Sequence, residues 1–277
     1  LRVRQLTMDD AHIYATEEQI FDEVSSILDM MIAFYKNFGF EYEFRFATRP
    51  AQRAGTDEMW DRSEKDLAEV LKKKRIKAGD KKGDGAFYGP KIDVHIKDSL
   101  GRDWQLATVQ LDFHQPEAFK LVYIDKDGKE KRPVMIHRAI FGSFERFIGI
   151  LTEHYQGAFP LWLCPTQTVI IPIADRHIEF ASSIVRTIEL QGIRVGLDDR
   201  KETVSSKIRD ATLQKVPYMG IMGDREIEKS EIRNPKSETN IMKEGFISVR
   251  TREGKDLGQL KISQFLNKLK EEIDKKI

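Results

Sequence analysis

The sequence predicts two domains of different type: an α+β domain on an antiparallel sheet, followed by an α/β domain with a mixed sheet. In the first part, segments that alternate apolar and charged residues lie between helical segments, which is typical of half-buried antiparallel strands. In the second part, short apolar segments alternate with helical ones. Two prolines, Pro160 and Pro165, bracket a short connector between these parts, so we place the domains at 1–160 and 161–277.

The elements of the first domain follow from hydrophobic periodicity. Residues 16–38 are expected to form a helix, because Thr16 suits the N-cap and apolar residues from Ile20 onward recur at helical spacing. The other expected elements are a strand at 40–46, a helix at 57–74, a strand at 91–98, a turn at Gly101, a return strand at 103–113, a hairpin at Asp127-Gly128 and a long apolar helix at 138–154.

The elements of the second domain alternate with a helix-sized period. Strands are expected at 168–173, 193–197, 218–222 and 246–251, and helices at 176–191, 205–215 and 263–275. Residues 228–244 are polar, and we expect them to form a surface loop between two strands.

Composition excludes several classes of protein. No segment approaches the ~18 apolar residues of a membrane span, and no apolar region follows the first four residues, so we expect neither a membrane protein nor a signal peptide. Cys164 is the one cysteine, which excludes an internal disulfide and fits a reducing, cytoplasmic compartment. Lys and Arg (46) nearly balance Asp and Glu (45), so net charge alone does not predict nucleic-acid binding.

Several segments of the first domain combine polar residues with glycines. They are Asp9-Asp10-Ala11-His12 before the first expected helix, a glycine-rich turn at 83–91, a strand at 104–113 with polar residues at every second or third place, and His137-Arg138 at the start of the expected long helix. Polar side chains on one face of a sheet, beside glycines that allow close approach, indicate a small-molecule site. Two histidines and a carboxylate could hold a metal. A lone histidine, however, is more often a surface or core residue.

Taken together and in order, these segments resemble the class II threonyl-tRNA synthetases along essentially the whole chain. The matching segments are Arg2-Val3-Arg4 with Asp9-Asp10-Ala11-His12 (the end of motif 2 and the segment after it), 85–91 (the substrate loop), 108–113 (a core strand), and 133–139 with 142–146 (motif 3). The resemblance implies a class II synthetase catalytic domain that lacks its N-terminal part, followed by an anticodon-binding domain.

The resemblance implies a threonine–tRNA ligase, which uses ATP with Mg²⁺ to convert L-threonine to threonyl-adenylate and then transfers it to tRNA(Thr). The residues matched to catalytic positions are Arg2, Lys91 and Arg146, and those matched to substrate-binding positions are Asp10, Tyr88, Gln105 and Thr108. The two arginines would bind ATP phosphates, which suits a planar guanidinium that stays charged.

The family also uses Zn²⁺, held by one cysteine and two histidines. His12 and His137 match the two histidines, and Asp10 matches the carboxylate that accepts the hydroxyl of threonine. Three protein ligands with one open position are typical of a catalytic zinc site. A metal that demands a hydroxyl ligand would exclude valine, which packing alone separates poorly from threonine.

In the second domain, the resemblance places six charged residues on the stretch that faces the anticodon. They are Arg200, Lys207, Arg209, Lys215, Glu226 and Arg250. Basic residues would hold the RNA backbone, and the glutamate could accept hydrogen bonds from a base edge. Taken one at a time, each could equally be a solvated surface charge.

The chain departs from the family pattern at four positions. Leu6 stands in place of an aromatic residue that stacks on adenine, Met8 in place of a glutamine, Lys201 in place of an asparagine and Lys215 in place of a frequent arginine. Motif 1, the first half of motif 2, the zinc cysteine and the editing domain are absent from the 277 residues. We therefore expect this chain alone not to aminoacylate tRNA, and we expect a homodimer only of the full-length protein.

Two other interpretations remain open. The first is a non-catalytic tRNA- or RNA-binding protein derived from a truncated synthetase, which the retained pocket residues argue against. The second is a class IIa synthetase for another amino acid, which the Asp-Ala-His and His-Arg-Ala segments argue against.

Overall fold

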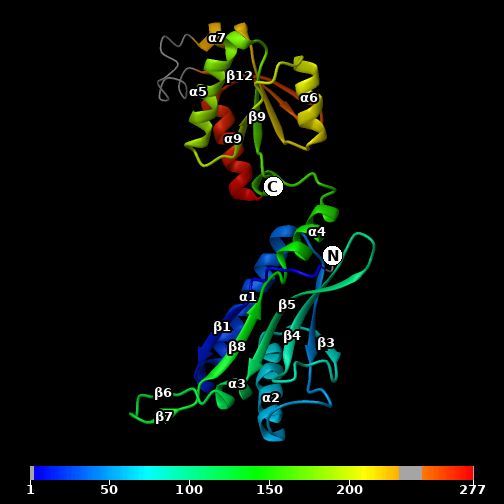
Figure 1. Ribbon diagram of the computed structural model, residues 1–277, viewed down its shortest axis with the longest axis vertical. Coiled ribbons are helices and arrows are strands. Elements are labelled where there is room, and N and C mark those ends of the chain that lie inside the picture. Colours follow the sequence, from blue (N-terminus) through cyan, green and yellow to red (C-terminus); the bar gives the residue numbers. More distant parts are fainter. Residues whose placement is uncertain (1–2, 231–244, 277) are drawn as a thin grey trace. The chain divides into compact units, whose positions relative to one another are not determined.

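The computed structural model describes residues 3–230 and 245–276. The chain divides into two compact units, Leu1–His154 and Tyr155–Ile277, each built around its own sheet (Figure 1). No helix among the described residues is both long enough and apolar enough to span a bilayer.

The first unit has a six-stranded sheet in the order β1-β8-β5-β4-β2-β3. Its strands are β1 (Ala11–Ala15), β2 (Tyr42–Ala47), β3 (Ala78–Lys81), β4 (Lys91–Lys97), β5 (Asp103–Asp112) and β8 (Val134–Ala139). Every neighbouring pair is antiparallel except β2 and β3, which run parallel. The predicted α+β fold on an antiparallel sheet is confirmed, with one parallel edge strand in addition.

Two helices, α1 (Ile20–Phe38) and α2 (Asp57–Lys73), contact β5 and each other. A short 3₁₀ helix, η1 (Glu17–Gln19), precedes α1 after Thr16, whose backbone N–H donates to the Gln19 side chain at 2.8 Å. The apolar stripe of α1 is buried, and its Tyr35 hydroxyl donates to the Ile140 carbonyl at 2.7 Å. The predicted helices at 16–38 and 57–74 are therefore confirmed.

The predicted helix at 138–154 is wrong at its start. Residues 138 and 139 end strand β8, and helix α4 (Phe144–His154) begins only after a turn at Gly142, whose φ is 74°. Because β8 lies between β1 and β5, five of its six residues are buried. A strand buried on both faces shows no alternation, so the pattern could not separate it from a helix. The short strand β1, which pairs with β8, was not predicted either.

A small hairpin extends from the first unit between β5 and β8. It consists of β6 (Tyr123–Ile124) and β7 (Glu130–Lys131), and it follows the five-residue helix α3 (His114–Ala118). Gly128 has a φ of 76°, as the hairpin predicted at Asp127-Gly128 requires.

The second unit has a five-stranded mixed sheet in the order β10-β9-β11-β12-β13. Its strands are β9 (Thr168–Pro172), β10 (Val195–Leu197), β11 (Tyr218–Met222), β12 (Phe246–Thr251) and β13 (Asp256–Lys261), and its helices are η2 (Leu161–Leu163), η3 (Asp175–His177), α5 (Ile178–Glu189), α6 (Val204–Leu213), α7 (Asp224–Ser230) and α9 (Ile262–Lys275). Strands β10, β9 and β11 are parallel, while β12 and β13 are antiparallel to their neighbours. The predicted mixed sheet is confirmed.

Adjacent residues of β9 point into two separate cores. Ile170 packs in a cluster that contains Ile184 of α5 and Phe265 of α9, whereas Ile171 packs with Ala211 of α6. Helices therefore cover both faces of the sheet, which makes the three-layer arrangement expected of an α/β domain. The sequence missed α7 and β13. The loop predicted at 228–244 overlaps the end of α7 at 228–230, and its remainder, 231–244, lies outside the described residues.

Candidate functional site

Four of the predicted site residues meet at one end of the first sheet. His12 of β1 and His137 of β8 are directly opposite each other in the strand register, and their ring centroids are 4.6 Å apart. The Tyr88 ring lies 5.0 Å from the His137 ring. Asp10 Oδ2 is 4.0 Å from His12 Nε2. The structure thus brings together two imidazoles, a phenol and a carboxylate from segments far apart in the sequence.

The two histidines differ in their surroundings. The His12 side chain is 44% exposed, whereas His137 is buried and its Nε2 lies 2.9 Å from Oδ2 of the fully buried Asp112. If Nε2 carries the proton and donates it to Asp112, Nδ1 is left with a lone pair, as a metal ligand must be. Asp112 is the last residue of β5 and was not among the predicted site residues. No group of three metal-binding side chains occurs among the residues that the structure describes.

Gln110, which was not predicted as a site residue, holds Tyr88 against the sheet. The Tyr88 hydroxyl donates to the side chain of Gln110, whose amide nitrogen lies 3.4 Å from the Thr108 hydroxyl. Burial raises the pKa of Tyr88, and the nearby charges of Asp112 and Asp10 raise it further. The phenol is therefore a hydrogen-bonding group here, and it connects the histidine pair to Thr108.

The glycine-rich loop that carries Tyr88 lies unusually close to the neighbouring backbone. A Cβ atom added at Gly89 would lie 1.9 Å from the Leu111 carbonyl oxygen, and one at Gly85 would lie 2.7 Å from the Thr48 carbonyl oxygen. The Gly85 N–H also donates to Thr48 O at 2.8 Å. The glycines are thus needed for close approach.

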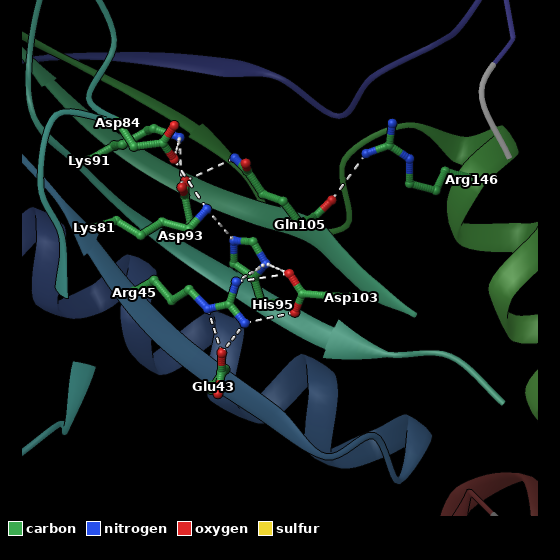
Figure 2. Close-up of polar contacts among 10 residues, drawn as sticks. All are labelled: Glu43, Arg45, Lys81, Asp84, Lys91, Asp93, His95, Asp103, Gln105 and Arg146. Carbon is green, nitrogen blue, oxygen red and sulfur yellow. Dashed lines mark hydrogen bonds and ion pairs between the residues drawn. The ribbon is translucent and has the colours of Figure 1, made fainter. Parts of the chain in front are cut away.

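A second polar group lies farther along β4 and β5 (Figure 2). Lys91 is almost entirely buried, and its Nζ donates to Asp93 at 2.7 Å. The Gln105 side chain donates to the other oxygen of Asp93 at 2.9 Å, and the Gln105 carbonyl accepts from Arg146 NH1 at 3.1 Å. Lys91, Gln105 and Arg146, all predicted site residues, are therefore connected.

Arg146 retains hydrogen-bonding capacity. Its guanidinium lies over the Trp104 ring at 5.3 Å from the centroid. Its Nε is buried and has no hydrogen-bond partner among residues 3–230 and 245–276. A buried donor without a partner is unusual in a folded protein and marks a place where an anionic ligand could bind.

The polar network continues along the same strands to a buried histidine (Figure 2). His95 Nδ1 lies 2.8 Å from Asp103 Oδ2, and Arg45 binds the same carboxylate through two nitrogens at 2.7 and 2.8 Å. Lys81 Nζ lies 3.3 Å from His95 Nε2 and 3.1 Å from Asp84 of the glycine-rich loop. Burial lowers the pKa of His95, and the Arg45 and Lys81 charges lower it further against the opposing hydrogen bond to Asp103. His95 was not predicted as a site residue, because its place in an alternating segment is typical of the polar face of a strand.

The segment before β1 holds predicted and unpredicted residues. Arg2, a predicted catalytic residue, lies outside the described residues. Leu6 and Met8, two of the departures from the family pattern, are about half exposed. Asp9, which was not predicted, accepts backbone N–H groups of Ile140 at 2.7 Å and Gly142 at 3.1 Å. Asp9 therefore binds the segment before β1 to the turn that precedes α4.

In the second unit, predicted residues line a cavity of about 360 Å³ at the ends of β9 and β10 and the start of α6. Arg200 contributes to its wall and bridges Asp198 at 2.7 Å and Asp210 at 2.9 Å. Lys207 also lines it and is 4% exposed, and its Nζ lies 3.4 Å from the Pro172 carbonyl. Because this is the one hydrogen bond of the buried ammonium among the described residues, and a long one, the ammonium is available to an anionic ligand.

The other four predicted residues of the second unit are not part of that cavity wall. Arg209 and Lys215 are exposed, and Arg250 is half-buried on β12. Glu226 is buried, and its carboxylate accepts hydrogen bonds from the Gly223 N–H and from the side chains of Ser248 and Gln259. Because a carboxylate has about four accepting positions, Glu226 can accept about one more hydrogen bond.

Family models match both units. The model for "tRNA synthetase class II core domain (G, H, P, S and T)" matches residues 1–155, and the model for "Anticodon binding domain" matches residues 167–272. The threonine–tRNA ligase of Caldanaerobacter subterraneus subsp. tengcongensis is 48% identical over 273 residues, which are 99% of this chain and 40% of that protein. The corresponding ligase of Carboxydothermus hydrogenoformans is 48% identical over 276 residues, 100% of this chain and 41% of that protein. The chain thus spans about 40% of the length of these curated relatives.

Two solved structures are similar over nearly the whole chain. The RNA binding domain of threonyl-tRNA synthetase from Cryptosporidium parvum Iowa II has a TM-score of 0.85 and 36% identity, covering 98% of this chain and 64% of that one. The "putative threonyl-tRNA synthetase ThrRS-1" from Aeropyrum pernix has a TM-score of 0.72 and 25% identity, covering 100% of this chain and 65% of that one.

Proposed function

The chain belongs to the class II tRNA synthetases of the G, H, P, S and T group, and from this membership we propose that it supplies active-site and anticodon-binding residues of a threonine–tRNA ligase. The observation that carries the choice of threonine is the pair of opposed histidines, His12 and His137, with Asp10 beside them. We further propose that the ligase acts in the cytoplasm and as a homodimer.

In this proposal the first half-reaction uses cations to hold ATP. The carboxylate of threonine attacks the α-phosphate, and pyrophosphate leaves. Arg146, whose Nε has no hydrogen-bond partner in the described part of the chain, would bind phosphate oxygens, and Lys91 would add a second positive charge. Mg²⁺ would accompany ATP. Such chemistry depends on positioning and on neutralisation of charge, which the stacked guanidinium and the buried ammonium are suited to provide.

The donor set at the histidine pair fits a zinc ion. His12 and His137 would be two ligands, and Asp112 would keep His137 in the required tautomer. When bound, zinc would act as a Lewis acid that selects an amino acid with a hydroxyl group. Asp10 would accept a hydrogen bond from that hydroxyl, and Tyr88 would close the pocket beside it.

The second unit would bind the anticodon of tRNA(Thr). We favour the cavity that Arg200 and Lys207 line as the place for an RNA phosphate or an unstacked base. Its wall combines three cations (Arg200, Lys201 and Lys207) with the N-terminus of α6, and three carboxylates (Asp175, Asp199 and Glu202) line it as well. The exposed Arg209 and Lys215 would add contacts to the RNA backbone.

The proposal is tested with the full-length gene product in a threonine-dependent ATP–pyrophosphate exchange assay, followed by charging of tRNA(Thr). Exchange should require threonine and should not occur with valine. His12→Ala and His137→Ala should each lower exchange and the zinc content measured by elemental analysis. His154→Gln is the matched control, because this histidine lies at the end of α4 and packs on the Phe40 ring instead.

Either of two results would reject the proposed function. One is a full-length protein that binds tRNA(Thr) but shows no exchange with any amino acid, which would favour the non-catalytic RNA-binding interpretation. The other is exchange driven by a different amino acid.

A further inference from the structure

We propose that Asp93 is the positioning residue on which the orientation of Lys91 and Gln105 depends. Its carboxylate is fully buried, with one oxygen 2.7 Å from Lys91 Nζ and the other 2.9 Å from Gln105 Nε2 (Figure 2). This inference rests on the proposed function, because Lys91 and Gln105 are substrate-site residues only within it. Asp93 itself would touch no substrate.

The strand geometry accounts for both contacts. Lys91 and Asp93 are two residues apart on β4, so their side chains leave the same face of the sheet. The pairing of β4 with β5 is irregular between Asp93 and His95, where two steps on β4 correspond to three on β5. Such a bulge changes the direction of nearby side chains, and here Gln105 reaches Asp93 although it pairs with His95.

Asp93 also reaches Arg146 indirectly. The backbone carbonyl of Gln105 accepts from Arg146 NH1 at 3.1 Å. Gln105 therefore contacts Asp93 through its side chain and Arg146 through its backbone. Among the residues that the structure describes, the other carboxylate within 4.0 Å of Lys91 Nζ is that of Asp84, whose Oδ2 lies at 3.8 Å, beyond hydrogen-bonding distance. Without Asp93, the buried ammonium would keep only that loop carboxylate, and its direction would no longer be set.

The role differs from that of a buried carboxylate that only supports the fold. Glu64 of α2 is a useful contrast, because it is largely buried and holds Arg49 through three hydrogen bonds. Within residues 3–230 and 245–276, none of its hydrogen bonds or ion pairs involves a predicted site residue. Asp93, by comparison, directs its two hydrogen bonds to two predicted site residues. Loss of Asp93 should therefore change the reaction, whereas loss of Glu64 should change stability alone.

The test is a double-mutant cycle in the full-length gene product, measured by threonine-dependent ATP–pyrophosphate exchange. Asp93→Asn should lower kcat about 10²-fold with a much smaller change in KM for threonine, as expected when a reacting group is misplaced by about 1 Å. Lys91→Met should cause a similar loss. Because Asp93 acts in part through Lys91, the double variant Lys91→Met/Asp93→Asn should lose less activity than the product of the two single losses.

Controls separate positioning from folding. Glu64→Gln should leave kcat within about twofold of the unmodified protein while lowering the urea midpoint. If Asp93→Asn fails to fold, the double variant Lys91→Met/Asp93→Leu takes its place, because it removes both buried charges together and leaves neither unpaired. Its kcat is then compared with that of Lys91→Met. Losses that multiply in either double variant, or an Asp93→Asn protein with unchanged kcat, would overturn the inference. An unmodified protein without exchange activity would instead reject the proposed function.

Discussion

Replacement of Gly89 by alanine should disable the site while the fold persists. An added Cβ would lie 1.9 Å from the Leu111 carbonyl oxygen and 3.0 Å from the Leu111 carbonyl carbon, both of which are backbone atoms of β5. An ordinary carbon–oxygen contact is about 3.3 Å, so the loop would have to move away from the strand by ~1.4 Å. A rotamer change cannot relieve this clash, because no flexible side chain is involved.

The size of the effect follows from what the loop carries. Tyr88 precedes Gly89, and its ring packs 5.0 Å from His137, while Lys91 follows two residues later. A shift of about 1 Å at a reacting group can lower the rate about 10²-fold. Forced overpacking costs about 1–3 kcal/mol of stability, which a domain of ordinary stability survives. We therefore expect a folded Gly89→Ala protein with about 10²-fold lower ATP–pyrophosphate exchange.

Gly83→Ala is the matched control, because Gly83 belongs to the same loop but has nothing within 4 Å of an added Cβ. Its φ of 80° means that alanine there adds backbone strain of about 1–2 kcal/mol without a clash. Exchange rates and urea midpoints of both variants are measured in the full-length gene product. Equal exchange rates for the two variants would refute the close-approach argument.

Three further predictions concern other parts of the chain. Asp9→Ala should lower the free energy of unfolding, measured in urea, by about 3 kcal/mol, because a carboxylate that accepts several backbone N–H groups is lost. Asp10→Ala should change the free energy of unfolding by less than about 0.5 kcal/mol, and equal losses in the two variants would contradict this prediction. Burial would raise the pKa of Asp98, but hydrogen bonds from Trp104 and Arg102 lower it from 3.8 to about 2, so its stabilisation is present above pH 3.8 and is lost as the pH falls toward 2. Asp98→Asn should therefore flatten the acid limb of a stability–pH curve, and an unchanged limb would argue against this assignment. Lys207→Met should weaken binding of tRNA(Thr) and reduce the slope of the logarithm of the binding constant against the logarithm of salt concentration by about 0.7–0.9. The control Lys270→Met on α9 should change neither, and binding titrations at several salt concentrations would test both variants.

Much of the fold could be predicted because each predicted element carried a visible period or a turn residue. Helices such as 16–38 bury one stripe, and hairpins such as Asp127-Gly128 need a positive φ. Strand β8 could not be recognised for the opposite reason. It lies inside the sheet between β1 and β5, so its sequence is almost uniformly buried and resembles the start of the helix that follows.

The candidate site was predicted mainly from its resemblance to a family, and the structure adds residues that hold the predicted ones. Asp112 contacts His137, Gln110 contacts Tyr88, and Asp9 binds the turn before α4. Nothing local separates Asp9 from Asp10, because both are aspartates ahead of a strand. Only the position of the turn at 140–142 makes Asp9 the structural residue and leaves Asp10 beside His12.

Strand β4 shows most clearly what an alternating pattern can and cannot establish. Its alternation of charged and apolar residues predicts a strand with one face in solvent, yet all residues from Lys91 to Ile96 are buried. Alternation reports that a strand has two chemically different faces, but it does not report what covers the polar one. Here Lys91 donates to Asp93 of the same strand, Asp93 also accepts from Gln105 of β5, and His95 contacts Asp103 of β5. Since buried charges need partners, a strand that alternates lysine, aspartate and histidine is better interpreted as a candidate internal polar face than as a solvated edge.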